Sequence, residues 1–276
     1  MRLLTTFLLA CAACLGAEPF FFIQVSDPQF GMETRNMDFA QETASFEFVV
    51  ATINRLRPAF VVITGDLINK EGDDAQAKEF LRIAAKLEKS IPLYNAPGNH
   101  DVGNEPTAAT LAAYRGRFGR DYYSFRHGTF AGFVLDSSII SEPKHVPDEL
   151  KKQEAWLRQE LASAKAAGAQ HLVIFQHHSW FLERGDEPNQ YFNIPLERRK
   201  PYLDLFHESG VKALFSGHYH RNAYGRDGDL EMVTSGPSGK PLGKDQSGIR
   251  VVIVRDSGIE HRYYELGSLP QHIEIK

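Results

Sequence analysis

The sequence predicts an α/β fold in which mixed β-sheets are flanked by helices. Short apolar runs alternate with segments of helical periodicity, and the end of the chain switches to strand-like segments. A polar cluster directly follows four of the apolar runs, and a fifth cluster follows a weaker run. Because the loops beyond the carboxyl ends of strands converge in an open α/β sheet, we expect these clusters to meet at one crevice.

The elements follow from the pattern in chain order. Buried strands are predicted at residues 21–25, 60–63, 91–96 (the weaker run), 172–175 and 211–215. Helices are predicted at 38–57, 75–89, 107–118 and 148–167, the first ended by Pro58 and the last by Gly168. A hairpin is predicted at 122–125 and 130–135, and further strands at 232–234, 250–254 and 259–266.

The polar clusters share one chemistry, that of metal ligation. They are Asp27-Pro28-Gln29, Gly65-Asp66, Gly98-Asn99-His100-Asp101, His177-His178 and Gly217-His218-Tyr219-His220. Carboxylate, amide and imidazole groups hold hard or borderline divalent cations. The clusters therefore predict a dinuclear metal site.

The order of these clusters resembles that of the calcineurin-like metallophosphoesterases. It is most similar to the branch of serine/threonine-protein phosphatases with a calcineurin-like phosphoesterase domain. The resemblance extends from about Phe20 to near the C-terminus, and its longest stretches are PGNHDVGNEPTA (97–108) and GVKALFSGHYHRNA (210–223). It implies a four-layer α/β/β/α sandwich of two mixed sheets with helices outside.

The resemblance also assigns the metal ligands. Asp27, Gln29 and His220 would bind the first ion, Asn99, His177 and His218 the second, and Asp66 would bridge both. Taken alone, Asp66 could instead cap the following helix. His177 rather than His178 follows from the family pattern, although Ser179 stands where that pattern has proline.

Gln29 departs from most of the superfamily, which has histidine at this position. A glutamine offers a neutral carbonyl oxygen, a poorer donor to iron or zinc but acceptable to manganese or magnesium. The identity of the two ions therefore stays open among Mn, Fe, Zn and Mg. The related phosphatase branch also carries Asp-Pro-Gln, so this residue is compatible with an active site.

The resemblance gives His100 a catalytic role beside the scissile phosphate, with Asp101 orienting its ring. The alternative for His100 is a turn histidine that hydrogen-bonds the backbone. Arg221, Asn222 and Asn193 are candidates for substrate binding, and exposed loop polarity explains these three equally well.

These residues predict a phosphoesterase that hydrolyses phosphate monoesters by direct attack of a metal-bound hydroxide. The resemblance implies phosphoprotein as a substrate. One alternative is a phosphodiesterase for small nucleotides or lipid-derived diesters, which uses the same metal pair. Another is a non-catalytic binding module that lost activity through Gln29. Acidic and basic residues are interspersed at a net charge of −4, so no nucleic-acid partner is expected.

The first residues predict a signal peptide at 1–17, followed by one phosphoesterase domain at 18–276. Arg2 precedes a nearly apolar stretch at 3–15 that is too short for a membrane span, and residues 15–17 form a candidate cleavage site. The protein is therefore expected to be exported, to the periplasm or the medium. An ordinary N-terminal strand is the alternative. A lipid anchor at Cys11 is disfavoured because Leu9 is bulky for a lipoprotein box.

Overall fold

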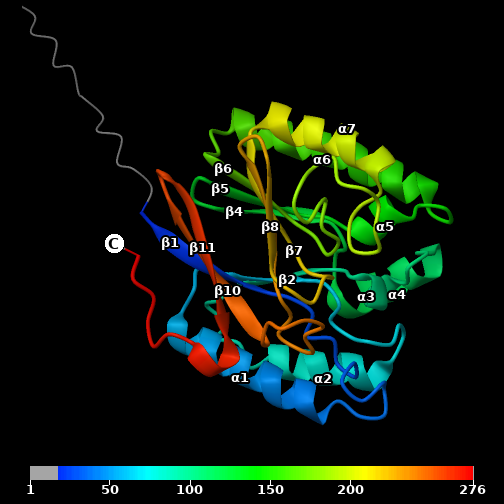
Figure 1. The fold of residues 1–276 in the computed structure, drawn as a ribbon, viewed down its shortest axis with the longest axis vertical. Coiled ribbons are helices and arrows are strands. Elements are labelled where there is room, and N and C mark those ends of the chain that lie inside the picture. The colour runs from blue at the N-terminus through cyan, green and yellow to red at the C-terminus, as the bar shows by residue number, and fades with distance from the viewer. Residues whose placement is uncertain (1–17, 276) are drawn as a thin grey trace, which may run out of the picture.

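Two mixed β-sheets form the centre of the computed structural model, which describes residues 18–275 (Figure 1). The predicted signal peptide lies outside the described residues. The first sheet has the strand order β11 (Gly258–Glu265), β10 (Gly248–Arg255), β1 (Phe20–Val25), β2 (Val61–Thr64) and β3 (Leu93–Ala96). The second has the order β4 (Tyr123–His127), β5 (Phe130–Val134), β6 (His171–Phe175), β7 (Val211–Ser216), β9 (Leu230–Thr234) and β8 (Ala223–Asp227).

Both sheets combine a parallel centre with antiparallel edges. In the first sheet, β1 pairs in parallel with β2 and β2 with β3, whereas β10 runs antiparallel to β1 and to β11. In the second, β5, β6, β7 and β9 are parallel, and β4 and β8 close the edges as antiparallel strands. The parallel strands therefore end on the same side of each sheet, which brings the loops that follow them together.

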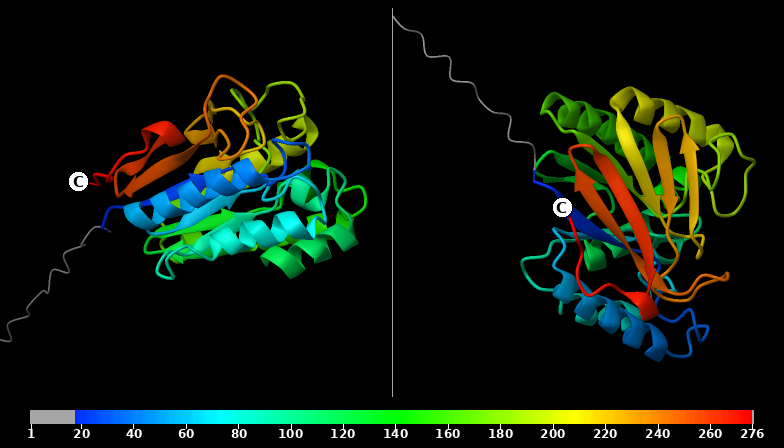
Figure 2. Two further views of the ribbon diagram at one scale, coloured as in Figure 1. Left: turned by 90° about the horizontal axis from the view of Figure 1, so that it is seen from below. Right: turned by 60° about the vertical axis from the view of Figure 1, so that its left-hand side comes forward.

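Helices cover the outer face of each sheet, so the fold has four layers (Figures 1 and 2). Helices α1 (Ala40–Leu56) and α2 (Asp74–Ala84) pack on the first sheet, and α6 (Pro147–Ala166) and α7 (Leu196–Ser209) on the second. The shorter helices are α3 (Asn99–Val102), α4 (Ala108–Phe118), α5 (Ser137–Ser141) and the 3₁₀ turn η1 (Leu266–Ser268). The predicted α/β/β/α sandwich is confirmed.

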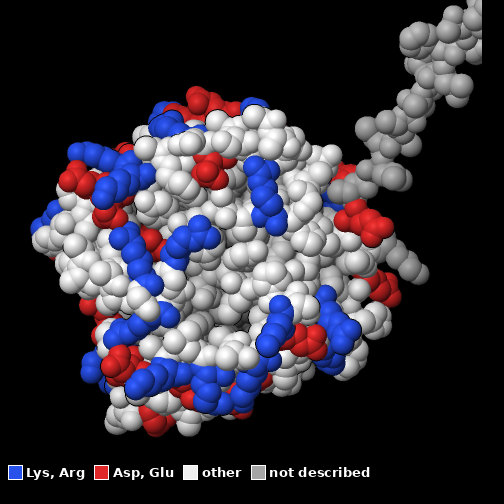
Figure 3. Space-filling model, turned by 180° about the vertical axis from the view of Figure 1, so that it is seen from behind, with Lys and Arg blue, Asp and Glu red and all other residues white. Residues whose placement is uncertain are grey.

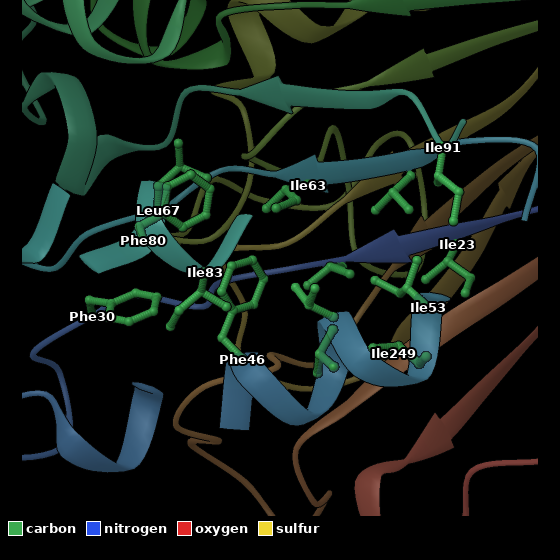
Figure 4. Packing of buried hydrophobic residues seen from close by; sticks show 14 of the residues in the cluster. Ile23, Phe30, Phe46, Ile53, Ile63, Leu67, Phe80, Ile83, Ile91 and Ile249 are labelled. Carbon is green, nitrogen blue, oxygen red and sulfur yellow. The ribbon is translucent and has the colours of Figure 1, made fainter. Parts of the chain in front are cut away.

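Three apolar clusters hold the layers together. One lies between α1, α2 and the first sheet, where Phe46 of α1 stacks on Phe80 of α2 at 5.3 Å between ring centroids (Figure 4). A second lies under α6 and α7. The third fills the space between the two sheets and is rich in aromatic rings, including Phe22 and Phe60, which stack at 4.8 Å.

Most predicted elements are present within a few residues, but α7, β8 and the short helices α3, α5 and η1 were missed. Helix α7 contains Pro201, which lacks the backbone N–H of a helix interior and therefore hides the helical pattern. Strand β8 is an edge strand with only Gly225 buried, so it has no alternating apolar pattern. Helix α2 ends at Ala84, five residues before the predicted end at Lys89.

The charged surface carries mixed signs on the face shown in Figure 3, where Lys and Arg side chains lie beside Asp and Glu at several places. Arg115, for example, contacts both Asp121 and Glu149 at 2.6 Å. Within residues 18–275, none of the helices is long and apolar enough to cross a membrane.

We predict that Phe22→Ala lowers the free energy of unfolding by about 3–5 kcal/mol, because it removes a fully buried ring from between the sheets. Urea denaturation followed by circular dichroism measures the change. Phe48→Ala is the control, since Phe48 is 50% exposed on α1. An equal loss in both variants would contradict this account of the inner core.

Candidate metal centre

The predicted ligands lie at the ends of five strands. Asp27 follows β1, Asp66 follows β2, Asn99 follows β3, His177 follows β6 and His218 follows β7. Each follows the carboxyl end of its strand, in the loops that the parallel pairing gathers on one side. The two sheets therefore contribute to one site, as the sequence pattern predicted.

The carboxylates and histidines form two groups that share Asp66. Asp27, Asp66 and His220 offer ligand atoms within 4.8 Å of one another, and so do Asp66, His177 and His218. All five side chains are buried. Within the described residues, this is the arrangement expected for two cations bridged by one carboxylate.

The distances within each group match ligands of a single ion. The Nε2 atom of His220 lies 3.3 Å from Oδ1 of Asp27, and Nε2 of His177 lies 3.3 Å from Oδ2 of Asp66. The side-chain oxygen of Asn99 approaches His177 Nε2 to 3.0 Å. Two donors that are each about 2.1 Å from one cation, at right angles, lie roughly 3 Å apart.

Each of the three histidines in these groups uses one ring nitrogen for a backbone carbonyl. The contacts are His177 Nδ1 to Thr64 O (2.9 Å), His220 Nδ1 to Lys240 O (2.6 Å) and His218 Nε2 to Tyr191 O (3.1 Å). A carbonyl only accepts, so the bonded nitrogen carries the proton and the other is left with its lone pair. Metal-binding histidines are oriented in this way. The residues present therefore fit a dinuclear centre.

The electrostatics of the site favour positive charge. Burial lowers the pKa of His177, but the charges of Asp66 and Asp27, together with hydrogen bonds to Asp66 and to the carbonyl of Thr64, outweigh burial and raise this pKa to about 9. Burial likewise opposes protonation of His220, yet Asp27 raises its pKa. Burial, with the nearby His177, lowers the pKa of His218 to about 4. The negative potential of the two carboxylates that favours a proton at His177 and His220 also attracts a cation.

Gln29 has the orphaned atom expected of a ligand. Its side chain is fully buried, and its Oε1 has no hydrogen-bond partner within residues 18–275. Its backbone N–H donates to the carbonyl of Asp66 at 2.9 Å, which holds the residue beside the shared carboxylate. An unpaired buried carbonyl oxygen is costly unless a cation or donor satisfies it. Ligation by Gln29 remains a prediction, and this geometry is compatible with it.

His100 lies beside the shared carboxylate, and its backbone N–H donates to Asp66 Oδ1 at 2.9 Å. Its Nδ1 lies 2.6 Å from the carbonyl oxygen of Asn69, so Nδ1 carries a proton and Nε2 is left for a substrate. The role predicted for Asp101 needs correction. Its carboxylate accepts hydrogen bonds from backbone N–H groups, those of Leu67, Ile68 and Gly98, and not from the ring of His100.

Asp101 joins the loops after β2 and β3. Burial and the charge of Asp66 raise the pKa of Asp101 to about 7, although the three N–H groups oppose the shift. The carboxylate thereby holds the Asp66 loop against the start of α3. It supports the position of His100 through the backbone, while Asn69 orients the ring.

Two of the three predicted substrate contacts are corrected by the structure. The amide of Asn193 is buried and bonds Glu187 Oε1 and Pro188 O, and it accepts from Gln190 N–H. Asn222 is bound on both sides of its amide, to Asp245 and Arg250. These hydrogen bonds tie both asparagines to neighbouring loops, and both side-chain N–H groups of Asn193 are already used.

Arg221 stays a candidate for substrate binding. It is partly exposed, donates to Leu242 O at 3.0 Å and packs 5.0 Å from the ring of Tyr219. His178, which the family pattern excludes as a ligand, is buried with its Nδ1 2.9 Å from the hydroxyl of Ser137. Burial keeps the pKa of His178 well below its ordinary value, so its ring is neutral and packs in the interior next to the site.

Two further residues lie beside the centre, and the first of them, Asn69, was not foreseen from the sequence. Asn69, three positions after Asp66, supplies the carbonyl that orients His100. Tyr191 is 62% exposed, its ring lies 4.9 Å from that of His218, and its hydroxyl is 3.4 Å from Nδ2 of Asn99. Asn69 lies in the loop after Asp66, but only the folded chain shows that its carbonyl oxygen contacts the ring of His100.

The backbone around the centre is strained. Among described residues other than glycine, eight have positive φ, and five of these are predicted ligands. They are Asp27 (45°), Gln29 (39°), Asp66 (51°), His218 (67°) and His220 (53°). Such conformations persist only where the surroundings impose them, and they cluster at functional sites.

The fold and this site together define a metallophosphoesterase, a hydrolase of phosphate esters with a dinuclear metal centre. The family model of the calcineurin-like phosphoesterases matches residues 22–222, and the chain belongs to that family.

Known proteins agree with this assignment. The chain is 39% identical to the human serine/threonine-protein phosphatase CPPED1, with 92% of this chain and 86% of the relative covered. It is 35% identical to the CPPED1 of Danio rerio, with 92% and 87% covered. A crystal structure of a dimetal phosphatase from Danio rerio shares the fold at a TM-score of 0.62 and 14% identity, over 89% of this chain and 99% of that one.

We predict that Gly98→Ala reduces the metal content of the purified protein strongly. A Cβ at this position would lie 2.1 Å from Oδ1 and 2.3 Å from the backbone nitrogen of Asp66, so the bridging carboxylate would have to move. Mass spectrometry of bound metals measures the loss. Gly116→Ala on α4, where a Cβ meets no atom within 4 Å, should retain full metal content. Full metal content in Gly98→Ala would contradict the position assigned to Asp66.

Proposed function

We propose that this protein hydrolyses phosphate monoesters, and that phosphoserine or phosphothreonine in proteins is among its substrates. The observation that carries the proposal is the pair of ligand groups sharing Asp66, with His100 beside them. The substrate class is supported by the relatives, which are named serine/threonine-protein phosphatases and match nearly the whole chain.

The chemistry that a bound pair of divalent cations supplies is the activation of a water and the neutralisation of charge on the phosphoryl oxygens. Asp66 would hold the shared position, because it belongs to both ligand groups. Asp27, Gln29 and His220 would hold one ion, and Asn99, His177 and His218 the other. Phosphoryl transfer depends mostly on such positioning, because it asks for little covalent chemistry from the protein.

His100 is placed to hold a proton for the leaving oxygen. Its Nδ1 proton is committed to the carbonyl of Asn69, so Nε2 is the nitrogen that can donate to a substrate. The ring is half-buried at the start of α3, and its backbone N–H is fixed by Asp66. Substrate access and a fixed orientation are the two requirements of a general acid.

We predict that Asp66→Asn and His100→Ala separate metal binding from catalysis. Asp66→Asn should abolish turnover together with binding of both ions, because both groups share this carboxylate. His100→Ala should lower kcat by about 10²–10⁴-fold, the usual contribution of a positioned acid. Its metal content should stay near that of the wild type. Kinetics combined with metal analysis of the same samples measures both effects, and loss of metal in His100→Ala would contradict its assigned role.

The choice of substrate is tested by hydrolysis of an aryl phosphate monoester and the matching bis-aryl diester by residues 18–276 in manganese. Asp66→Asn is the control for contaminating phosphatases. We expect the monoester to be preferred and phosphoserine peptides to be turned over as well. Preference for the diester would replace the monoesterase by a phosphodiesterase. Lack of turnover with manganese, iron, zinc and magnesium would favour a binding module.

We further propose that residues 1–17 direct export, on the basis of Arg2 and the apolar stretch after it. Expression of the full chain in a bacterial host, followed by fractionation and intact-mass analysis, tests this. We expect a processed protein in the periplasm or medium that begins near residue 18. An uncleaved protein in the cytoplasm would contradict export, and a chain that begins at a lipid-modified Cys11 would show anchoring instead.

A further inference from the structure

A chain of side-chain amides connects helix α2 to Gln29. Gln76 of α2 is 2% exposed and its Nε2 donates to Oδ1 of Asn36 at 2.9 Å. The same Oδ1 accepts from Nδ2 of Asn69 at 2.7 Å. Oδ1 of Asn69 in turn accepts from Nε2 of Gln29 at 3.2 Å. Four amides therefore follow one another from the helix to the metal centre, and we call them the amide relay (Gln76, Asn36, Asn69 and Gln29).

The direction of the amide relay is set at its far end. Oε1 of Gln76 accepts the backbone N–H groups of Asn69 (3.0 Å) and Lys70 (2.9 Å). A backbone N–H can only donate, so the oxygen of Gln76 must face the backbone and its NH₂ must face Asn36. An amide flip at Gln76 would bring three donors together and lose both bonds.

This direction passes from residue to residue. Asn36 must present its oxygen, because the NH₂ of Gln76 donates to it, and Asn69 must then present its NH₂ to Asn36. The oxygen of Asn69 is left to accept from Gln29. Gln29 must therefore turn its NH₂ toward Asn69 and its Oε1 away from Asn69. This Oε1 is buried and has no hydrogen-bond partner within the described residues.

The backbone is adapted to the amide relay. A Cβ at Gly31 would lie 2.4 Å from Nε2 of Gln76 and 3.0 Å from Oδ1 of Asn36, so the network needs glycine here. Asn36 itself has φ of 67°, a left-handed conformation, and its N–H bonds the carbonyl of Gly31 at 2.8 Å. This loop and α2 together hold the amides in place.

Resting on the proposed dinuclear function, we propose that the amide relay is a positioning device that turns the carbonyl oxygen of Gln29 toward the first metal ion. A glutamine can present either an oxygen, which binds a cation, or an NH₂ group, which repels it. The device removes this ambiguity. Asn69 also links the first ion to catalysis, since its side chain orients Gln29 and its backbone carbonyl orients His100.

The test reverses the amide relay from its far end without touching the metal ligands. In Gln76→Glu, one carboxylate oxygen still accepts from the backbone, but the other replaces the NH₂ that faces Asn36. Asn36 must then present its NH₂, Asn69 must flip to present its oxygen to Asn36, and the NH₂ of Asn69 meets the oxygen of Gln29. The NH₂ of Gln29 would thereby face the first ion.

The matched control is Asn36→Asp, which adds the same charge to the same network. Its carboxylate accepts from both Gln76 and Asn69, so the direction of the amide relay is kept. A second variant, Gln29→Glu combined with Gln76→Glu, offers the metal an oxygen in either orientation. Circular dichroism and thermal unfolding of each variant identify any loss of fold.

Calorimetric titration of each metal-free protein with manganese is the main measurement. We expect Gln76→Glu to weaken one of the two sites by about 10–100-fold, the usual effect of changing a group that orients a ligand. Asn36→Asp should bind both ions as the wild type does, and the double variant should regain the lost affinity. Equal weakening in Gln76→Glu and Asn36→Asp, or unchanged affinity in Gln76→Glu, would overturn the proposal.

Failure of the amide relay can be distinguished from failure of the proposed function. If the wild type bound two ions without hydrolysing a phosphate ester, the function would fail while the titrations still decide on the amide relay. If it bound none, both the proposed function and the role of the amide relay would be overturned. Hydrogen exchange of the side-chain NH₂ of Gln29, read by NMR in the metal-free protein, checks the direction of the relay separately. We expect slow exchange in the wild type and in Asn36→Asp but not in Gln76→Glu, and equal exchange in all three would overturn the relay.

Discussion

The structure depends on one buried carboxylate, that of Asp66. A charge at 1% exposure is tolerated only where opposite charge or donors compensate it, and the structure gathers histidines and the N–H of His100 around this carboxylate. Both sheets supply this compensation, because His100 follows β3 of the first sheet and His177 follows β6 of the second. The sandwich is thus the means of bringing two sets of loops to one carboxylate.

The loops that carry the ligands around Asp66 have strained backbones. Asp27, Asp66 and His220 have left-handed backbones, which are uncommon in residues other than glycine, and the space between the two sheets is packed with aromatic rings. The rigid core holds the loops in place, so the ligands need not be reorganised when ions bind. The packing between the sheets therefore pre-organises the ligands of the metal centre.

The sequence was sufficient to predict the features that depend on hydrophobic periodicity and on the order of the polar clusters along the chain. Apolar runs followed by polar clusters predicted the strands and the grouping around Asp66, because residues at strand ends converge whatever their separation in the chain. The sequence did not predict the role of a polar residue where that role depends on its hydrogen-bond partners in the folded chain. Asn193 and Asn222 are polar loop residues near the ligands, as a substrate contact would be, yet only the fold shows that their amides are already bonded. Helix α7 was missed because Pro201 masks its pattern.

The glutamine at position 29 shows why such partners matter for function. A histidine ligand is oriented by one hydrogen bond to its second nitrogen, as His177 and His220 are by backbone carbonyls. A backbone carbonyl beside a glutamine would fix the position of its NH₂ group. The neighbour of Gln29 is instead a side-chain amide, which can flip together with the glutamine and so does not fix its orientation by itself. Direction must come from a group that cannot reverse, and the backbone N–H groups at Gln76 are such a group. A ligand substitution at the centre is thereby tied to a helix on the outer layer.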